Sequence, residues 1–442
     1  MKLLLLAVFL AGSSLAEEWS VALNSTSLTV HMDETVGVPI SVYIPDNTDI
    51  LFARLTSTNT DPDVAVVDEP LFPQNFNKAT FWNSSFNVTG LFLGNTKIVF
   101  EIVSNEGTYS SKELNVAVIR AQRLVDTLFT ASVAVLVSIL YINFGCAMDW
   151  SVCRNTLRRP VGPAIGAFCQ FIIMPLLSYV IGYLLFPNRP ELQIGIFFTG
   201  ISPSGGASNI WTVLLGGNLN LSVTMTTLGT IASFATMPIW IFTLGARIFD
   251  KGNLTVPYSR IAMLAVGLVI PLSLGFIIQK KLPKLSRILV RVMKPFSVVL
   301  ILFIIIFAIV TNLYLFKLFS WQIVVAGMGL AWLGYICGGI AMVIFRQPNV
   351  DVRAIAIETG IQNTGIAIFL LRFSLTQPAA DLTTVIPVAC AIMTPIPLTI
   401  IWLIKLFFDR RRKKLAASME KLQKIAEPIS TITPTSETTI LQ

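Results

Sequence analysis

Nine long apolar segments follow residue 123, and they constrain the fold more than any other feature of the sequence. A helix needs about 20 predominantly apolar residues to cross a bilayer. Only 13% of the chain is charged, whereas soluble domains are about 25% charged. The sequence therefore predicts an all-α polytopic membrane domain over residues 121–408. The predicted spans are 124–146, 162–186, 191–215, 219–246, 259–279, 296–317, 321–345, 351–373 and 384–407.

The first 120 residues follow a different pattern. Residues 1–16 combine Lys2, an apolar run and small residues before two glutamates, which is typical of a signal peptide. In residues 17–120, short runs that alternate in polarity, such as Ser27–Met32 and Pro39–Ile44, are separated by turn residues. This pattern predicts a small all-β domain, similar to a β-sandwich, on the extracellular or lumenal side.

Glycosylation motifs and basic loops predict the orientation. The motif Asn-X-Ser/Thr occurs at Asn24, Asn83, Asn87 and Asn253, and it is glycosylated only outside the cytosol. An extracellular N-terminus and nine crossings place the C-terminus inside. The loops after the first and fifth spans and the basic tail, residues 409–442, then face the cytosol, as the positive-inside rule expects. We expect the plasma membrane as the location and a disordered end to the tail.

Cysteine and histidine usage excludes several chemistries. All five cysteines follow residue 120 without metal-ligand spacing, and the single histidine, His31, lies in the predicted β-domain. A His-dependent triad or zinc site within the membrane is therefore excluded. The basic excess lies in loops and in the tail, so it indicates membrane orientation and lipid contact rather than nucleic-acid binding. No nucleophile–base pair is visible, and we expect no enzyme activity.

Two polar stretches interrupt the apolar spans. Ser202–Asn209 lies in the third predicted span and Glu358–Asn363 in the eighth. Glycine beside hydroxyl and amide side chains unwinds a helix, and lipid cannot satisfy the backbone groups that are freed. The two spans are five crossings apart, so they run in opposite directions. Such paired interruptions are typical of inverted-repeat transporters with two broken, crossing helices.

Glu358 is the one acidic residue after position 120 that we place inside a span. An unpaired carboxylate in a bilayer costs several kcal/mol, so such residues usually face the protein interior and mark an ion or proton path. Its neighbours in both stretches supply almost only oxygen, which a hard cation such as Na⁺ prefers. Close packing of helices could also account for the glycines Gly205 and Gly206. Packing gains nothing from a carboxylate, however, so Glu358 favours an ion site.

Three sequence blocks resemble the sodium/bile-acid symporter family: Ser204–Asn209, Gly217–Ser222 and Glu358–Asn363. The similarity runs from about residue 143 to residue 402, and the combination of blocks at this separation is specific. The family's usual Cys-Pro-Gly-Gly motif reads Ser202-Pro203-Ser204-Gly205-Gly206 here. The β-domain resembles that of the family's orphan-type members, which carry such a domain before nine spans.

The resemblance implies two sodium sites and a substrate region. The first sodium site comprises Ser208, Asn209, Ser222, Thr226 and Glu358. The second comprises Gln170, Glu358 and Gln362 with backbone oxygens of Thr359 and Ile361. The substrate region comprises Gly205, Gly206, Asn209 and Asn363.

The implied function is sodium-coupled symport, by alternating access, of an amphipathic organic anion such as a bile acid or a steroid conjugate. Two Na⁺ ions would be co-transported. One alternative is a proton-coupled carrier that uses Glu358. Another is a membrane receptor or scaffold that does not transport and whose β-domain binds a ligand.

Overall fold

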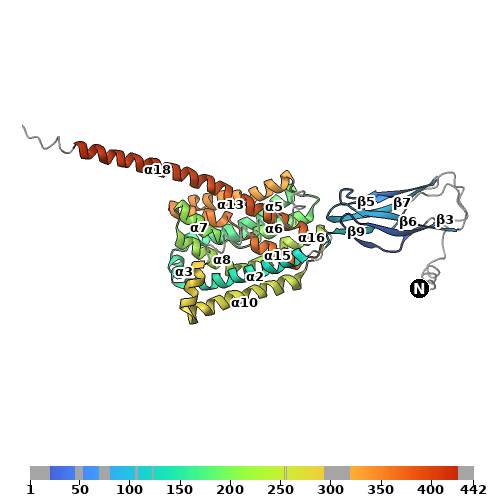
Figure 1. The fold of residues 1–442 in the computed structure, drawn as a ribbon, viewed down its shortest axis with the longest axis horizontal. Helices are drawn as coiled ribbons and strands as arrows, with labels where there is room; N and C mark the ends of the chain where they lie inside the picture. The colour runs from blue at the N-terminus through green and yellow to red at the C-terminus, as the bar shows by residue number, and fades with distance from the viewer. Residues whose placement is uncertain are drawn as a thin grey trace, which may run out of the picture. The chain divides into compact units, whose positions relative to one another are not determined.

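The computed structural model describes residues 20–44, 53–68, 80–104, 108–121, 124–252, 254, 256–292 and 319–426. The predicted signal peptide, the predicted span 296–317, Asn253 and the end of the tail lie outside these residues. The structure separates into a β-rich part and a helical part, which we describe individually (Figure 1).

The β-rich part contains two sheets. One has the strand order β1 (Ser20–Leu23), β3 (Thr35–Ile44), β6 (Thr80–Gly90) and β5 (Ala65–Asp68). The other has the order β2 (Ser27–His31), β9 (Leu114–Ile119), β7 (Gly94–Ser104) and β4 (Ala53–Asn59), with β8 (Thr108–Ser110) also on β7. Among the described strands, β2 and β9 pair in parallel and the other pairs are antiparallel.

One apolar core joins the two sheets. Val38, Ile40 and Val42 alternate with more exposed residues along β3, as expected for a strand with one buried face. Phe86 of the first sheet contacts Phe100 of the second, with ring centroids 4.1 Å apart. The all-β character predicted for this region is confirmed, and two packed sheets form the layers of a β-sandwich.

Five helical stretches among the described residues are long and apolar enough to cross a membrane. Their bounds are Val161–Leu185, Leu219–Lys251, Tyr258–Lys281, Trp321–Ile344 and Ala379–Arg412. A sixth is added if Ala134–Ala147 and Trp150–Leu157, which meet at a 67° bend, form one span. The polytopic all-α membrane part is therefore confirmed at this level, while the number of nine helices stays a prediction.

The helical elements follow one another along the chain with short connections. They are α2 (Leu124–Ala147), α3 (Trp150–Leu157), α4 (Val161–Phe168), η1 (Cys169–Ile173), α5 (Met174–Leu185), α6 (Pro190–Ile201), α7 (Ala207–Leu215), α8 (Leu219–Trp240), η2 (Ile241–Gly245), α9 (Ala246–Lys251), α10 (Tyr258–Lys281), α13 (Trp321–Ile344), α14 (Asn349–Gly360), α15 (Thr364–Ser374), α16 (Ala379–Leu382), α17 (Val385–Met393) and α18 (Pro395–Ala426). Here η marks a π-helical turn. Helix α18 continues through the first half of the predicted tail.

Both polar stretches interrupt their helices. The first break, residues 202–206, separates α6 from α7, and the second break, residues 361–363, separates α14 from α15. Helix α13 supports the second break through small residues, because Gly334 and Gly338 leave room for Gly360 and Thr359. A Cβ atom at Gly334 would lie 2.9 Å from the Cα atom of Gly360. These glycines therefore set how closely α13 approaches the second break.

Candidate ion and substrate site

The two breaks pair with each other through backbone hydrogen bonds. Ser204 and Gln362 form an isolated antiparallel bridge. The N–H of Gly205 donates to the carbonyl of Ile361 at 2.8 Å, and the N–H of Asn363 donates to the carbonyl of Pro203 at 2.8 Å. Each break thus satisfies backbone groups that the other would leave unpaired, as burial in an apolar environment requires.

Ser204 strengthens this pairing with its side chain. Its hydroxyl lies 2.9 Å from the carbonyl oxygen of Glu358 and 3.2 Å from that of Ile361. Both carbonyls are at the end of α14, where intrahelical donors are missing. The sequence identified Ser204 only as a departure from the family motif. That departure was the one signal that could have singled the residue out.

The side chain of Glu358 is buried among hydroxyl groups of α8. Its Oε2 atom accepts from the Ser222 hydroxyl at 2.8 Å, and its Oε1 atom accepts from the Thr226 hydroxyl at 2.5 Å. Only 3% of the Glu358 surface is exposed. Ser222 and Thr226 are four residues apart, so one face of α8 presents both hydroxyls to the carboxylate.

Helix α7 completes this group of oxygens. Oδ1 of Asn209 lies 2.9 Å from the Ser222 hydroxyl, and Nδ2 of Asn209 donates to Thr226 at 3.3 Å. The hydroxyl of Ser208 lies 3.5 Å from that of Thr226. The structure therefore brings together all five side chains that we assigned to the first sodium site. We call this group the carboxylate cluster: Ser208, Asn209, Ser222, Thr226 and Glu358.

The carboxylate cluster has more acceptors than protons to share. The Ser222 hydroxyl lies within hydrogen-bonding distance of both the Asn209 Oδ1 atom and the Glu358 carboxylate, yet it has a single proton. The Thr226 hydroxyl lies in the same way between the Glu358 carboxylate and the Ser222 carbonyl, at 2.5 and 3.1 Å. A cation bound among these oxygens would take up the surplus lone pairs, which is the chemistry expected of a Na⁺ ligand set.

The residues assigned to the second sodium site are only partly joined. Nε2 of Gln170 donates to Oε1 of Gln362 at 2.9 Å, and Nε2 of Gln362 donates to the Thr359 carbonyl at 2.7 Å. The Ile361 carbonyl instead accepts from Gly205 and Ser204. The described contacts of the Glu358 carboxylate lie in the carboxylate cluster. We call the joined residues, Gln170 and Gln362, the glutamine pair.

The four residues of the expected substrate region have different surroundings. Gly205 lies against the backbone of Gln362, and Gly206 lies against the ring of Phe144. Asn209 belongs to the carboxylate cluster. The side chain of Asn363 caps α15, since its Oδ1 atom accepts from the N–H of Ile366 at 3.2 Å.

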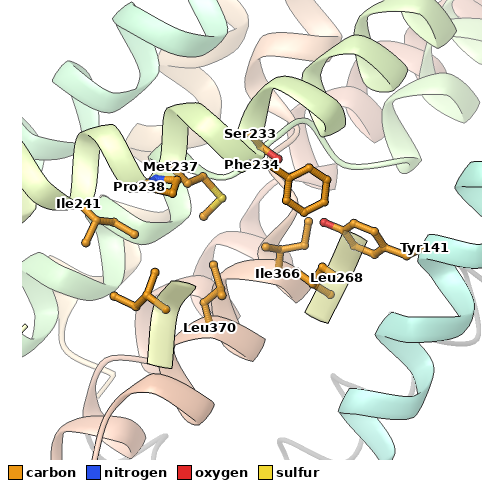
Figure 2. A pocket seen from close by; sticks show the side chains of 10 residues that line it. Tyr141, Ser233, Phe234, Met237, Pro238, Ile241, Leu268, Ile366 and Leu370 are labelled. Atoms are coloured by element: carbon orange, nitrogen blue, oxygen red, sulfur yellow. The ribbon is translucent and has the colours of Figure 1, made fainter. Parts of the chain in front are cut away.

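A small apolar pocket lies beside this site. Figure 2 shows Tyr141 of α2 and Phe234 of α8 on one side of it, with Ile366 and Leu370 of α15 close by. Leu268 of α10 is also part of the lining. The Tyr141 hydroxyl points into the pocket (Figure 2). Other lining residues are Ser233, Met237, Pro238, Ile241 and Ile261.

A line of buried hydroxyls along α8 connects the carboxylate cluster with the pocket. From Ser222 and Thr226 the line continues through Thr230 to Ser233, at spacings of three or four residues. Ser233 lines the pocket. Residues at such spacings lie on one face of a helix. The carboxylate cluster and the pocket are therefore built on the same face of α8.

A second buried carboxylate was missed by the sequence analysis. Asp381, which we placed between spans, lies in α16 with none of its surface exposed. Its Oδ1 atom lies 3.2 Å from the Arg372 guanidinium at the end of α15. A buried acid with such a partner is a structural ion pair. A local pattern gave no signal for it, because the partner is separated from Asp381 by a turn.

The predicted glycosylation sites in the β-rich part are accessible. Asn24, Asn83 and Asn87 are all exposed. The register places Asn83 opposite Ser41 and Asn87 opposite Gly37 on β3. Their exposure is compatible with modification, which stays a prediction.

Comparison with known proteins gives a family and several relatives. The sodium bile acid symporter family matches residues 134–318. The P3 protein of Homo sapiens is 30% identical over 260 residues, which cover 58% of this chain and 54% of that protein. The sodium-dependent organic anion transporter of Bos taurus is 31% identical over 258 residues, covering 57% and 66%. The ileal sodium/bile acid cotransporter of Cricetulus griseus is 29% identical over 273 residues, covering 61% and 77%.

The apolar helical part, with two broken helices that meet beside a buried carboxylate, defines an integral membrane protein with a polar site inside its helical bundle. Within this class, the chain is related to the sodium/bile acid symporter family, and the resemblance seen in its sequence is confirmed. The matched region spans about half the length of the P3 proteins. The family and the relatives with functional names are transporters rather than enzymes.

Proposed function

We propose that this protein is a sodium-coupled symporter of an amphipathic organic anion. The observation that carries the proposal is the burial of the Glu358 carboxylate among hydroxyl and amide oxygens from α7 and α8. A packing role would not need a carboxylate there, and the carboxylate has hydroxyl partners rather than a basic one among the described contacts. Relatives named as sodium-dependent transporters support the same conclusion.

Two Na⁺ ions per cycle are part of the proposal. The carboxylate cluster is the first site, and the second is built from the glutamine pair with Thr359, Ile361 and Glu358. Because the Ile361 carbonyl and the carboxylate have other partners here, we infer that ion binding at the second site rearranges these contacts. Two Na⁺ and an ionised Glu358 leave about +1, which a monovalent organic anion would neutralise.

The apolar pocket fits the anion's hydrocarbon part. Its lining is apolar apart from the hydroxyls of Tyr141 and Ser233, as in sites for amphipathic ligands. It adjoins α8 and α15, two helices that also form the ion site, and α2 and α10, which pack together at Gly145 and Gly275. We infer that the first pair of helices belongs to a core that moves against the second pair during alternating access.

The remaining features are proposals of the same kind. Nine spans in two inverted repeats would place the β-domain outside the cell and the tail in the cytosol of a plasma-membrane protein. Each cycle would then carry a net charge of +1 inward, driven by roughly 2.3 kcal/mol per 100 mV in addition to the sodium gradient. The β-domain is accessory to transport.

The test compares uptake in cells that express the full chain or its Glu358→Gln variant. Sulfated steroids and bile acids are offered with external Na⁺ or with choline in its place. We expect Na⁺-stimulated uptake that Glu358→Gln abolishes at unchanged surface expression. Asp351→Asn is the matched control, because Asp351 lies at the start of the same helix and contacts Asn218 at 2.7 Å, outside the carboxylate cluster. Uptake driven by a pH gradient without Na⁺ would instead support a proton-coupled carrier.

A receptor or scaffold is tested with a shorter chain. A chain that keeps its signal peptide but lacks residues 17–120 is expected to retain Na⁺-dependent uptake once it reaches the surface. If no anion of the panel is taken up by the full chain in either medium, the transport proposal is wrong for these substrates.

A further inference from the structure

The helix that carries Gln170 contains the π-helical turn η1. In this turn the N–H of Met174 donates to the carbonyl of Cys169, five residues earlier instead of four. Pro175 follows directly and has no N–H to donate. The carbonyl of Phe171, which a regular α-helix would pair with the N–H of residue 175, therefore has no such donor. The sequence itself thus favours an irregular turn beside Gln170.

Trp240, at the end of α8, supplies a donor for this carbonyl. Its Nε1 atom donates to the Phe171 carbonyl at 2.8 Å. A proline-interrupted membrane helix is tolerated where a neighbouring helix satisfies the freed backbone group. The Trp240 side chain does this from a different helix, so it fixes η1 relative to α8.

The same turn presents Gln170 to both breaks. Nε2 of Gln170 donates to the Ser202 carbonyl at 2.8 Å and to Oε1 of Gln362 at 2.9 Å. Gln170 is 4% exposed and directly precedes Phe171 in the chain. A turn of π-helix changes the direction of the side chains in it relative to a regular helix. Holding the Phe171 carbonyl therefore holds the Gln170 side chain as well.

We propose that Trp240 is a positioning residue for the second ion site: its hydrogen bond to Phe171 maintains η1, and η1 holds Gln170 against Gln362. The meaning of this role for ions rests on the proposed function, whereas the link between Trp240 and Gln170 does not. Helix α8 then supports both ion sites, the first through Ser222 and Thr226 and the second through its last residue.

The first experiment measures Na⁺ binding to the purified full chain. Thermal unfolding is followed while Na⁺ replaces K⁺ at constant ionic strength, and uptake is measured over the same Na⁺ range. Trp240→Phe keeps an aromatic ring but removes the N–H. We expect it to raise the Na⁺ concentration for half-maximal effect about tenfold, as loss of a group that orients a ligand typically does. The KM for the anion at saturating Na⁺ stays unchanged.

Trp332→Phe is the matched control. Nε1 of Trp332 donates to the Met393 carbonyl at 3.3 Å, so the control also removes one bond between an indole and a backbone carbonyl of another helix. It leaves the Na⁺ response as in the unmodified chain. Should Trp240→Phe fail to fold, Pro175→Ala takes its place: the new N–H competes for the Phe171 carbonyl, favours a regular helix and weakens the Na⁺ response in the same direction.

A double-mutant cycle separates this inference from the proposed function. In Na⁺-free medium, the effects of Trp240→Phe and Gln170→Ala on the unfolding temperature are expected to be non-additive, whereas those of Trp332→Phe and Gln170→Ala add. Additive effects in both cycles, or a Na⁺ response of Trp240→Phe equal to that of Trp332→Phe, overturn the positioning role. A full chain without any Na⁺ response overturns the proposed function alone, and the Na⁺-free cycle then decides the role of Trp240.

Discussion

The hydroxyl of Thr226 lies 2.5 Å from Oε1 of Glu358, and this contact joins α8 to the end of α14 just before the second break. A hydrogen bond to a charged group is stronger than one between neutral groups. Thr226 therefore contributes to the stability of the carboxylate as well as to the geometry of the proposed ion site. Its neighbour one helical turn along, Thr230, has a different partner.

We expect Thr226→Val to weaken sodium coupling. The substitution keeps the shape of the side chain but removes a hydrogen bond to a buried carboxylate, which is worth about 1.5–3 kcal/mol. The Na⁺ concentration for half-maximal uptake should rise at least about tenfold. The measurement is the Na⁺ dependence of anion uptake at a fixed anion concentration.

Thr230→Val is the control for this prediction. The Thr230 hydroxyl donates to the Thr226 carbonyl of its own helix at 2.7 Å, so its loss leaves the carboxylate cluster intact. Equal Na⁺ dependence in the two variants would show that the contact between Thr226 and Glu358 has no part in coupling.

Ser204→Ala tests the pairing of the two breaks. The variant loses the bond from the Ser204 hydroxyl to the Glu358 carbonyl, and a bond of this kind within a membrane protein contributes about 0.6–1 kcal/mol. The unfolding temperature should fall by more than in Ser202→Ala. The Ser202 hydroxyl donates to the Phe198 carbonyl in its own helix, and both serines are buried. Thermal unfolding of the purified chains decides; a larger loss in Ser202→Ala would contradict the role given to Ser204.

The sequence was informative where a feature conflicts with a lipid environment. The two breaks and the burial of Glu358 among hydroxyl groups could be predicted, because lipid satisfies neither the backbone groups freed beside the glycines nor a carboxylate within an apolar span. The ion pair between Arg372 and Asp381 could not, since burial of an acid depends on a partner that comes close only after folding.

The π-helical turns were also outside the reach of the sequence. Residues 162–186 and 219–246 each read as one continuous span, and η1 and η2 change the helical register inside them without changing their apolar character. Pro175 was the available signal in the first case. Its consequence depends on Trp240, which comes from a different helix.

Gly205→Ala is expected to separate the breaks. An added Cβ atom at Gly205 would lie 3.0 Å from the Gln362 carbonyl oxygen, which is backbone and is fixed by the pairing of the two breaks. At Gly206 the nearest atom is a ring carbon of Phe144 at 3.2 Å, and a side chain can move. Gly205→Ala should therefore reduce uptake much more than Gly206→Ala at equal surface expression.

The unfolding temperatures of the same two variants give an independent measurement. Displacing a paired backbone costs hydrogen bonds between the breaks, so Gly205→Ala should also be the less stable variant. Full uptake by Gly205→Ala would contradict the close approach of the two breaks during transport.

Tyr141→Phe separates the substrate region from the ion site. The Tyr141 hydroxyl points into the apolar pocket, where it can donate to a polar group of the anion (Figure 2). Loss of a neutral hydrogen bond costs about 1 kcal/mol, which raises the KM for the anion about fivefold. The Na⁺ dependence should not change, because the carboxylate cluster has no contact with Tyr141 among the contacts that the structure describes. Uptake is measured over a range of anion concentrations at saturating Na⁺ and over a range of Na⁺ at saturating anion, with Tyr179→Phe as a control outside the pocket lining. A shift in Na⁺ dependence with an unchanged KM would instead assign Tyr141 to the ion site and remove the pocket from the proposed substrate path.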